Sequence, residues 1–162
     1  MNIRAAVDLL KQIPLFAGVD EAHLQTLIFS SDELVVPQGR TMFEAGDPAT
    51  SAIVITSGEA VVHDGQTGSV LALSGPGSMF GEQSMIAGLP RQVTVNAKTE
   101  VEAIVIEQAV FMRLCSEFPE VGMQVLDVLS RQLGESSDAL ADVQELFQVQ
   151  PVEELLKSKT ET

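Results

Sequence analysis

Residues 74–94 read SGPGSMFGEQSMIAGLPRQVT, a glycine-rich turn followed by a short apolar segment and a single arginine. Gly75, Gly77 and Gly81 allow tight backbone turns that present free N–H groups. Residues 83–87 are long enough for one short helix whose amino end faces the same space. The stretch therefore predicts a pocket for one anionic group.

Two ionisable residues of this stretch suit the two parts of a sugar phosphate. Arg91 is the only Lys or Arg between residues 41 and 97, and a guanidinium binds phosphate through paired N–H donors. Glu82 can only accept hydrogen bonds when ionised, so it suits a sugar hydroxyl. Taken singly, Glu82 is more often a solvated turn residue, and Arg91 a surface cation paired with a carboxylate. Together they predict a ribose-phosphate site.

The segment Phe80-Gly81-Glu82, completed by Pro90-Arg91 and residues 93–95, resembles the phosphate-binding cassette of the cyclic nucleotide-binding domain family. That family includes bacterial catabolite activator proteins and the regulatory subunits of cyclic-nucleotide-dependent kinases. The resemblance implies that Glu82 holds the ribose 2′-hydroxyl and that Arg91 holds the cyclic phosphate. The ligand-binding residues expected from it in this stretch are Phe80, Gly81, Glu82, Gln83, Arg91, Gln92 and Val93.

Two positions depart from the family's pattern. Gln83 stands where Leu or Met is usual, and Gln92 replaces the small residue that follows the Arg. A long side chain beside the phosphate can crowd it or add a hydrogen-bond donor. A second hypothesis therefore stays open, in which the chain is a dimeric barrel scaffold that has lost nucleotide binding and acts through protein partners.

Outward from the cassette, residues 33–106 form short β-branched runs separated by Gly, Pro and Asp about every ten residues, typical of a β-barrel or sandwich. The expected strands are residues 34–36, 41–44, 52–56, 60–63, 70–73, 93–97 and 101–106. Gly39, Gly46 and Gly58 are interpreted as turn residues. The fold class is α+β, mainly β: an antiparallel jelly roll flanked by N-terminal helices and a long C-terminal helix, with a single core.

Helices are expected on both sides of the barrel. Residues 3–13 show one apolar face, and Asp20 is a plausible N-cap for a helix over residues 21–30. Residues 108–117 form a further short helix, and Pro119 fits the first turn of the next. The expected domain covers residues 1–147, with helices in 1–30, the barrel at 33–106, helices in 108–147 and a tail at 148–162.

The last helix, over residues 121–147, carries a heptad pattern. Its a positions are Leu126, Leu133, Leu140 and Phe147, and its d positions are Leu129, Ser136 and Val143. This pattern favours a homodimer through residues 126–147. The alternative is a helix that packs the same stripe against its own barrel.

A polar pair interrupts the heptads at Ser136 and Ser137. The two align with the Thr-Ser pair of the catabolite activator protein subfamily, which contacts adenine within one subunit and across the dimer. The resemblance therefore implies that Ser136 reads the base in its own subunit and that Ser137 reaches the ligand of the partner. It also favours cyclic AMP over cyclic GMP. The alternative is a weakened heptad without a ligand contact.

Charge and composition limit the classes of molecule that this chain is expected to bind. Twenty-three acidic and nine basic residues give a net charge of −14, which disfavours binding to DNA, RNA or anionic lipid. Only fifteen residues follow Phe147, and from these we expect no DNA-binding domain in this sequence. A single cysteine and the lack of a signal-peptide pattern or an 18-residue apolar run predict a cytosolic chain.

No constellation of catalytic residues is evident. His23 and His63 stand forty residues apart without metal-ligand spacing, and Cys115 lies on an apolar helical face. We therefore expect neither an enzyme nor a metal site. The sequence supports a cytosolic sensor that binds cyclic AMP or cyclic GMP and signals through its C-terminal helices to an unidentified protein partner.

Overall fold

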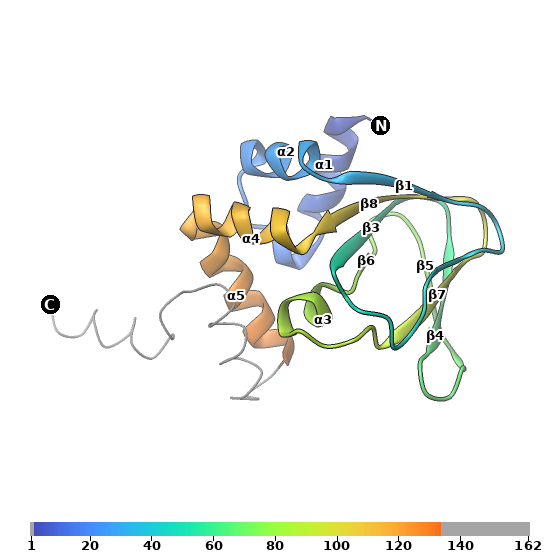
Figure 1. Ribbon diagram of the computed structural model, residues 1–162. Coiled ribbons are helices and arrows are strands. Elements are labelled where there is room, and N and C mark those ends of the chain that lie inside the picture. Colours follow the sequence, from blue (N-terminus) through green and yellow to red (C-terminus); the bar gives the residue numbers. More distant parts are fainter. Residues whose placement is uncertain (1, 134–162) are drawn as a thin grey trace, which may run out of the picture.

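The computed structural model describes residues 2–133 and consists of an antiparallel β-barrel with helices gathered at one end (Figure 1). The helices are α1 (Ile3–Lys11), the 3₁₀ helix η1 (Pro14–Phe16), α2 (Glu21–Phe29), α3 (Glu82–Ala87), α4 (Gln108–Glu117) and α5 (Pro119–Leu133). The strands are β1 (Asp32–Val36), β2 (Thr41–Phe43), β3 (Ser51–Ser57), β4 (Ala60–Asp64), β5 (Val70–Ser74), β6 (Met79–Phe80), β7 (Val93–Ala97) and β8 (Val101–Glu107).

The strands form two four-stranded sheets in which every pair is antiparallel. One sheet has the order β1-β8-β3-β6 and the other the order β2-β7-β4-β5. The two sheets face each other as the halves of a jelly roll, and the chain enters and leaves through helices (Figure 1). This confirms the mainly β fold class expected from the sequence.

The core is divided in two, which corrects the expectation of a single core. In β3, Ala52 and Val54 pack against the helices, whereas Ile53 and Ile55 face the other sheet. Because successive strand residues point to opposite faces, a strand with a helix layer on one side and a sheet on the other must be apolar on both. The central strands β3 and β8 therefore join the helical cluster to the barrel interior.

Local chain chemistry explains where the first helices begin and end. The Asn2 carboxamide oxygen accepts hydrogen bonds from the N–H groups of Arg4 and Ala5 and caps α1. This helix ends at Lys11, two residues before the expected end, because Pro14 opens the separate helix η1. Asp20 occupies the N-cap position of α2, as expected, but its side chain makes no capping hydrogen bond.

One strand of the barrel was not expected from the sequence. β6 is only two residues long, and it pairs Phe80 with Ile53 and Met79 with Val54 of β3. Two residues cannot show the alternation that identifies a strand, so the signal was absent. Its pairing nevertheless holds the cassette on the barrel.

The long C-terminal helix is described as far as Leu133, and residues 134–147 of the predicted helix lie outside the described residues. Pro119 begins α5, as expected. Leu126 is only 3% exposed and belongs to the helical cluster of its own chain. Its assignment to a dimer seam is therefore wrong, because α5 uses this position to pack into the helical cluster of its own chain. The side chains at the other heptad positions lie outside what the structure describes.

None of the helices within residues 2–133 is long and apolar enough to cross a lipid bilayer.

A pair of glycine substitutions tests how tightly the barrel turns are packed. Gly58 has φ +91°, and a Cβ there would lie 2.1 Å from the Glu100 carbonyl oxygen; Gly39 has φ +83° with no atom within 4 Å. Gly39→Ala should cost about 1–2 kcal/mol of unfolding free energy through backbone strain alone. Gly58→Ala should cost at least about 1 kcal/mol more because it also clashes. Urea denaturation measures both, and equal losses would contradict the packing of this turn.

Candidate functional site

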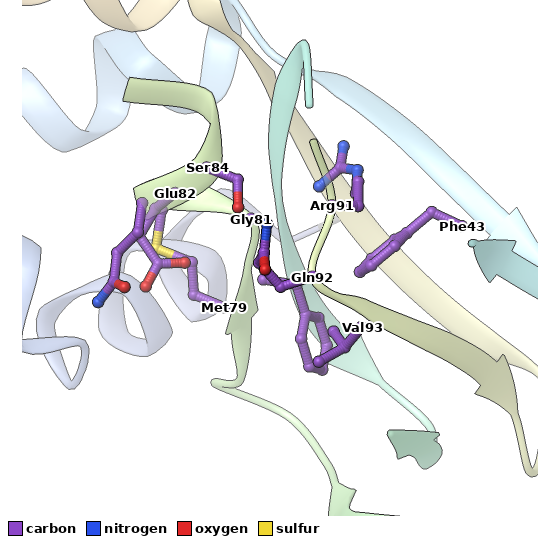
Figure 2. A pocket seen from close by; sticks show the side chains of 10 residues that line it. Phe43, Met79, Gly81, Glu82, Ser84, Arg91, Gln92 and Val93 are labelled. Atoms are coloured by element: carbon purple, nitrogen blue, oxygen red, sulfur yellow. The ribbon is translucent and has the colours of Figure 1, made fainter. Parts of the chain in front are cut away.

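A cavity of about 240 Å³ lies where β6, α3 and the start of β7 meet β2 (Figure 2). It is lined by Phe43, Met79, Phe80, Gly81, Glu82, Gln83, Ser84, Arg91, Gln92 and Val93. The structure thus brings together all seven residues expected in the cassette from residues 80–93. Ser136 and Ser137 lie outside the described residues.

Arg91 is buried, with only 6% of its surface exposed. Its Nη2 donates to the Ser51 carbonyl oxygen at 3.0 Å and to the Ser51 hydroxyl at 3.2 Å, and its Cζ lies 4.4 Å from the centroid of the Phe43 ring (Figure 2). The interpretation of Arg91 as a surface cation is therefore wrong. Its side chain is held by β2 and β3, which are remote in sequence.

The backbone of Arg91 is fixed as firmly as its side chain. The N–H of Arg91 donates to the Asp47 carbonyl at 2.8 Å, and its own carbonyl accepts from the Gly46 N–H at 2.8 Å. These two hydrogen bonds tie the backbone of Arg91 to the turn that contains Gly46, which has φ +93°. The turn therefore fixes the position from which the Arg91 side chain enters the cavity. The turn glycine Gly46 and the cassette arginine, both expected from the sequence, are thus joined by a backbone hydrogen bond.

The second terminal nitrogen of Arg91, Nη1, is buried and has no hydrogen-bond partner. A buried donor without an acceptor costs about 1–3 kcal/mol. A Cβ at Gly81 would lie 2.0 Å from this nitrogen, so only glycine fits there, and Gly81 also has φ +81°. The unpaired donor beside bare backbone is a site that suits an anionic acceptor.

Burial shifts the pKa values of both Arg91 and Glu82. Burial lowers the pKa of Arg91, and the carboxylates of Asp47 and Glu107 oppose that shift; a guanidinium remains charged at neutral pH. Burial raises the pKa of Glu82, against a smaller lowering by a hydrogen bond from its own backbone N–H. The cavity therefore holds a fixed cation and a carboxyl that is harder to ionise than an exposed one.

The two glutamines that depart from the family's pattern line the same cavity from different elements. Gln83 belongs to the first turn of α3, and Gln92 immediately precedes β7. The Gln92 Nε2 donates to the Pro90 carbonyl oxygen at 2.8 Å, so this amide is bonded within its own loop. A Cβ at Gly65 would lie 2.6 Å from the Gln92 carbonyl oxygen, so the β4–β5 hairpin packs directly on this loop.

Sequence reasoning missed four residues of the site. Met79 and Ser84 lie inside the quoted stretch and could have been found by extending the cassette by one or two positions. Phe43 and Ser51 lie on β2 and β3 and carry no local signal, since only the closed barrel brings them to Arg91.

The other candidate residues lie apart from this cavity. The His23 ring stacks on Phe118 with centroids 3.8 Å apart, and its Nδ1 lies 3.9 Å from an Asp20 carboxylate oxygen. Cys115 is buried in the helical cluster, and burial raises the pKa of its thiol to about 12. Within residues 2–133, no group of three or more His, Cys, Asp or Glu is arranged to hold a metal ion.

The raised pKa of Glu82 predicts a stability change with a definite sign. A carboxyl whose pKa is higher in the folded than in the unfolded chain stabilises the fold at low pH, and this contribution is lost as pH rises through the folded-state pKa. Glu82→Gln should therefore raise the melting temperature at neutral pH, and the gain should shrink toward pH 4. Melting curves across pH measure the difference, with the exposed Glu117→Gln as control. A pH-independent difference would contradict the burial of this carboxyl.

Comparisons with known proteins agree with this geometry. The family model described as the cyclic nucleotide-binding domain matches residues 33–118. The "CRP-like cAMP-activated global transcriptional regulator" of Mycobacterium tuberculosis is 29% identical over 84% of this chain and 62% of its own length. The cAMP-dependent protein kinase regulatory subunit of Yarrowia lipolytica is 31% identical over 65% of this chain and 28% of its own length. The chain thus spans less than two thirds of either relative.

A solved structure gives the same result. The crystal structure of the N-terminal domain of a transcriptional regulator from Streptomyces coelicolor superposes with a TM-score of 0.73 at 31% identity, covering 82% of this chain and 96% of that one. The matched residues 33–118 contain the whole cavity, from Phe43 to Val93. The chain belongs to the cyclic nucleotide-binding domain family.

Proposed function

We propose that this protein is a cytosolic sensor that binds a cyclic nucleotide in the cavity between β6, α3 and β7. The observation that carries the proposal is the buried, unpaired Nη1 of Arg91 beside Gly81. A phosphate oxygen is an acceptor that satisfies this donor, and its negative charge suits the guanidinium. The expected cassette residues from Phe80 to Val93 all line this one cavity of about 240 Å³, so a single ligand bound there can contact them.

The chemistry assigns a separate task to each end of the ligand. The cyclic phosphate accepts from Arg91, which Ser51 and Phe43 already hold in place, so little side-chain entropy is lost on binding. The ribose 2′-hydroxyl donates to Glu82 in its ionised form. Because burial raises the pKa of Glu82, ligand binding should release a proton near that pKa.

Base recognition and dimer contacts are proposed from residues beyond those described. Ser136 reads the base within its own subunit, and Ser137 reaches the ligand across a dimer formed by the C-terminal helices. Leu126 packs within its own chain, so such a dimer relies on the later heptads. With both serine contacts the preferred ligand is cyclic AMP rather than cyclic GMP.

The output of the sensor is proposed to be a protein contact. With a net charge of −14, the chain repels polyphosphates, so binding to DNA at physiological salt is not expected. The scaffold hypothesis is the second candidate, and Gln83 and Gln92 in the cavity wall are the observation that favours it. Ligand titration separates the two.

Thermal melting tests ligand binding directly. Cyclic AMP at about a hundred times its dissociation constant should stabilise the fold by about 2.7 kcal/mol, a rise of roughly 5–11 °C for a chain of this size. Arg91→Lys keeps the charge but loses the paired donors, so it should remove most of the shift. Arg113→Lys, on an exposed arginine of α4, is the matched control and should keep it. No shift with millimolar cyclic AMP or cyclic GMP would support the scaffold instead.

Calorimetry with both nucleotides tests the base contact. Ser136→Ala should reduce the preference for cyclic AMP by about 1 kcal/mol, the value of one hydrogen bond, while affinity for the shared ribose phosphate persists. Equal affinities for the two nucleotides in the unsubstituted protein, or an unchanged preference in the variant, would leave Ser136 without this role.

A further inference from the structure

Three polar or charged side chains are buried in the described chain, and all three lie in the cavity wall or touch it. They are Ser51, Ser84 and Arg91, each no more than 7% exposed. Ser84 and Arg91 line the cavity, whereas Ser51, the first residue of β3, contacts Arg91 without being part of the wall. Because a buried polar group is costly without a hydrogen bond, the partner of the Ser51 hydroxyl indicates why a polar residue stands there.

Ser51 binds one terminal nitrogen of the guanidinium and leaves the other. Its carbonyl oxygen, at 3.0 Å, and its hydroxyl, at 3.2 Å, both accept from Nη2 of Arg91. Nη1 has neither acceptor and lies beside Gly81, where a Cβ would be only 2.0 Å away. Because a guanidinium is planar and rigid, fixing Nη2 also fixes the direction of Nη1. Ser51 therefore determines which terminal nitrogen faces the bare backbone of Gly81.

The groups that hold Arg91 are uncharged. Both acceptors of Ser51 are neutral, and so is the Phe43 ring, which lies 4.4 Å from Cζ. In the described part of the chain the guanidinium forms no ion pair, and the carboxylates of Asp47 and Glu107 act on it from a longer range. A carboxylate bound directly to Arg91 would compensate its charge and repel an anion at close range. Neutral acceptors hold the side chain and leave its charge to a ligand.

We propose that Ser51 is a positioning residue of the anion site. It orients Arg91 through two neutral acceptors, so that Nη1 and an unpaired positive charge are presented to a phosphate oxygen at Gly81. Ser51 has this role only if the cavity binds a cyclic nucleotide, so the assignment rests on the proposed function. It extends the site to a residue forty positions before Arg91, on a strand whose next four residues are apolar.

Calorimetric titration with cyclic AMP tests the hydroxyl of Ser51. Ser51→Ala removes one of the two acceptors and keeps the carbonyl, so the affinity should fall roughly fivefold, the value of one hydrogen bond. Melting of the ligand-free chains separates this role from a structural one. If the hydroxyl served only the stability of β3, the melting temperature would fall and the affinity would stay unchanged, and that result would overturn the proposal.

A pair of variants of equal size tests whether the neutrality of Ser51 matters. Ser51→Asn and Ser51→Asp differ in charge, and only the second brings a carboxylate to Arg91. Ser51→Asp should bind cyclic AMP at least about tenfold more weakly than Ser51→Asn, because the new carboxylate repels the phosphate. Equal affinities of the two variants would overturn the proposal. If Ser51→Asp does not fold, the titration of Ser51→Ala decides.

Ser57→Asp is the matched control for net charge. Ser57 is the exposed last residue of the same strand, so this variant adds the same charge at the opposite end of β3 and should keep the affinity of the unsubstituted protein. A loss as large as that of Ser51→Asp would assign the effect to net charge and overturn the proposal. An unsubstituted protein that binds neither cyclic AMP nor cyclic GMP would overturn the proposed function itself. Binding that persists unchanged in Ser51→Ala would overturn the role of Ser51 alone.

Discussion

The site depends on one buried interaction, the guanidinium of Arg91 held between the carbonyl and hydroxyl of Ser51 and the ring of Phe43. A desolvated cation is costly unless it is paired. Here one nitrogen is paired and the other faces the bare backbone of Gly81. The protein thus carries a cost in stability at the place where an anion can compensate it, and this links the fold of the barrel to its proposed ligand.

One of the two strands that hold Arg91, β3, also contacts the helices. Ser51 begins β3, and the next residues of this strand alternate between the barrel interior and the helical cluster. From the cavity's other wall, Met85 and Ile86 of α3 reach into that cluster, and the Gln108 side chain donates to the Met85 carbonyl at 3.0 Å. A ligand that moves α3 therefore acts on α4 through packed side chains and one hydrogen bond, without a separate linker.

Burial shifts the pKa values of the two ionisable residues of the cavity in opposite directions, lowering that of Arg91 and raising that of Glu82. Arg91 stays charged because its intrinsic pKa is far above neutral. Glu82 loses its proton less readily than an exposed glutamate, because the same burial disfavours its charged form. The proposed sugar contact needs the ionised carboxylate, so the ligand must supply part of the free energy of ionisation. Stability and function are therefore opposed at Glu82, as is common at binding sites.

The sequence by itself determined the features that depend on neighbouring residues. Turn glycines such as Gly46 and Gly58, the proline that begins α5 and the alternation of the longer strands are local constraints on the backbone, so they could be predicted. The cassette residues from Phe80 to Val93 were also identified from sequence, because one short stretch supplies them. The two-residue strand β6 could not be, since it is too short to show a period.

Only the tertiary structure decided what depends on contacts between distant segments. The burial of Arg91 follows from Ser51, forty residues earlier, and from Phe43 on another strand. The heptad spacing favoured a dimer seam for Leu126, and only its packing among the helices assigned it to the core. A pattern of apolar residues predicts that one face of a helix is buried. Which surface buries it depends on the packing free energy of the whole chain, and no single stretch of sequence determines that quantity.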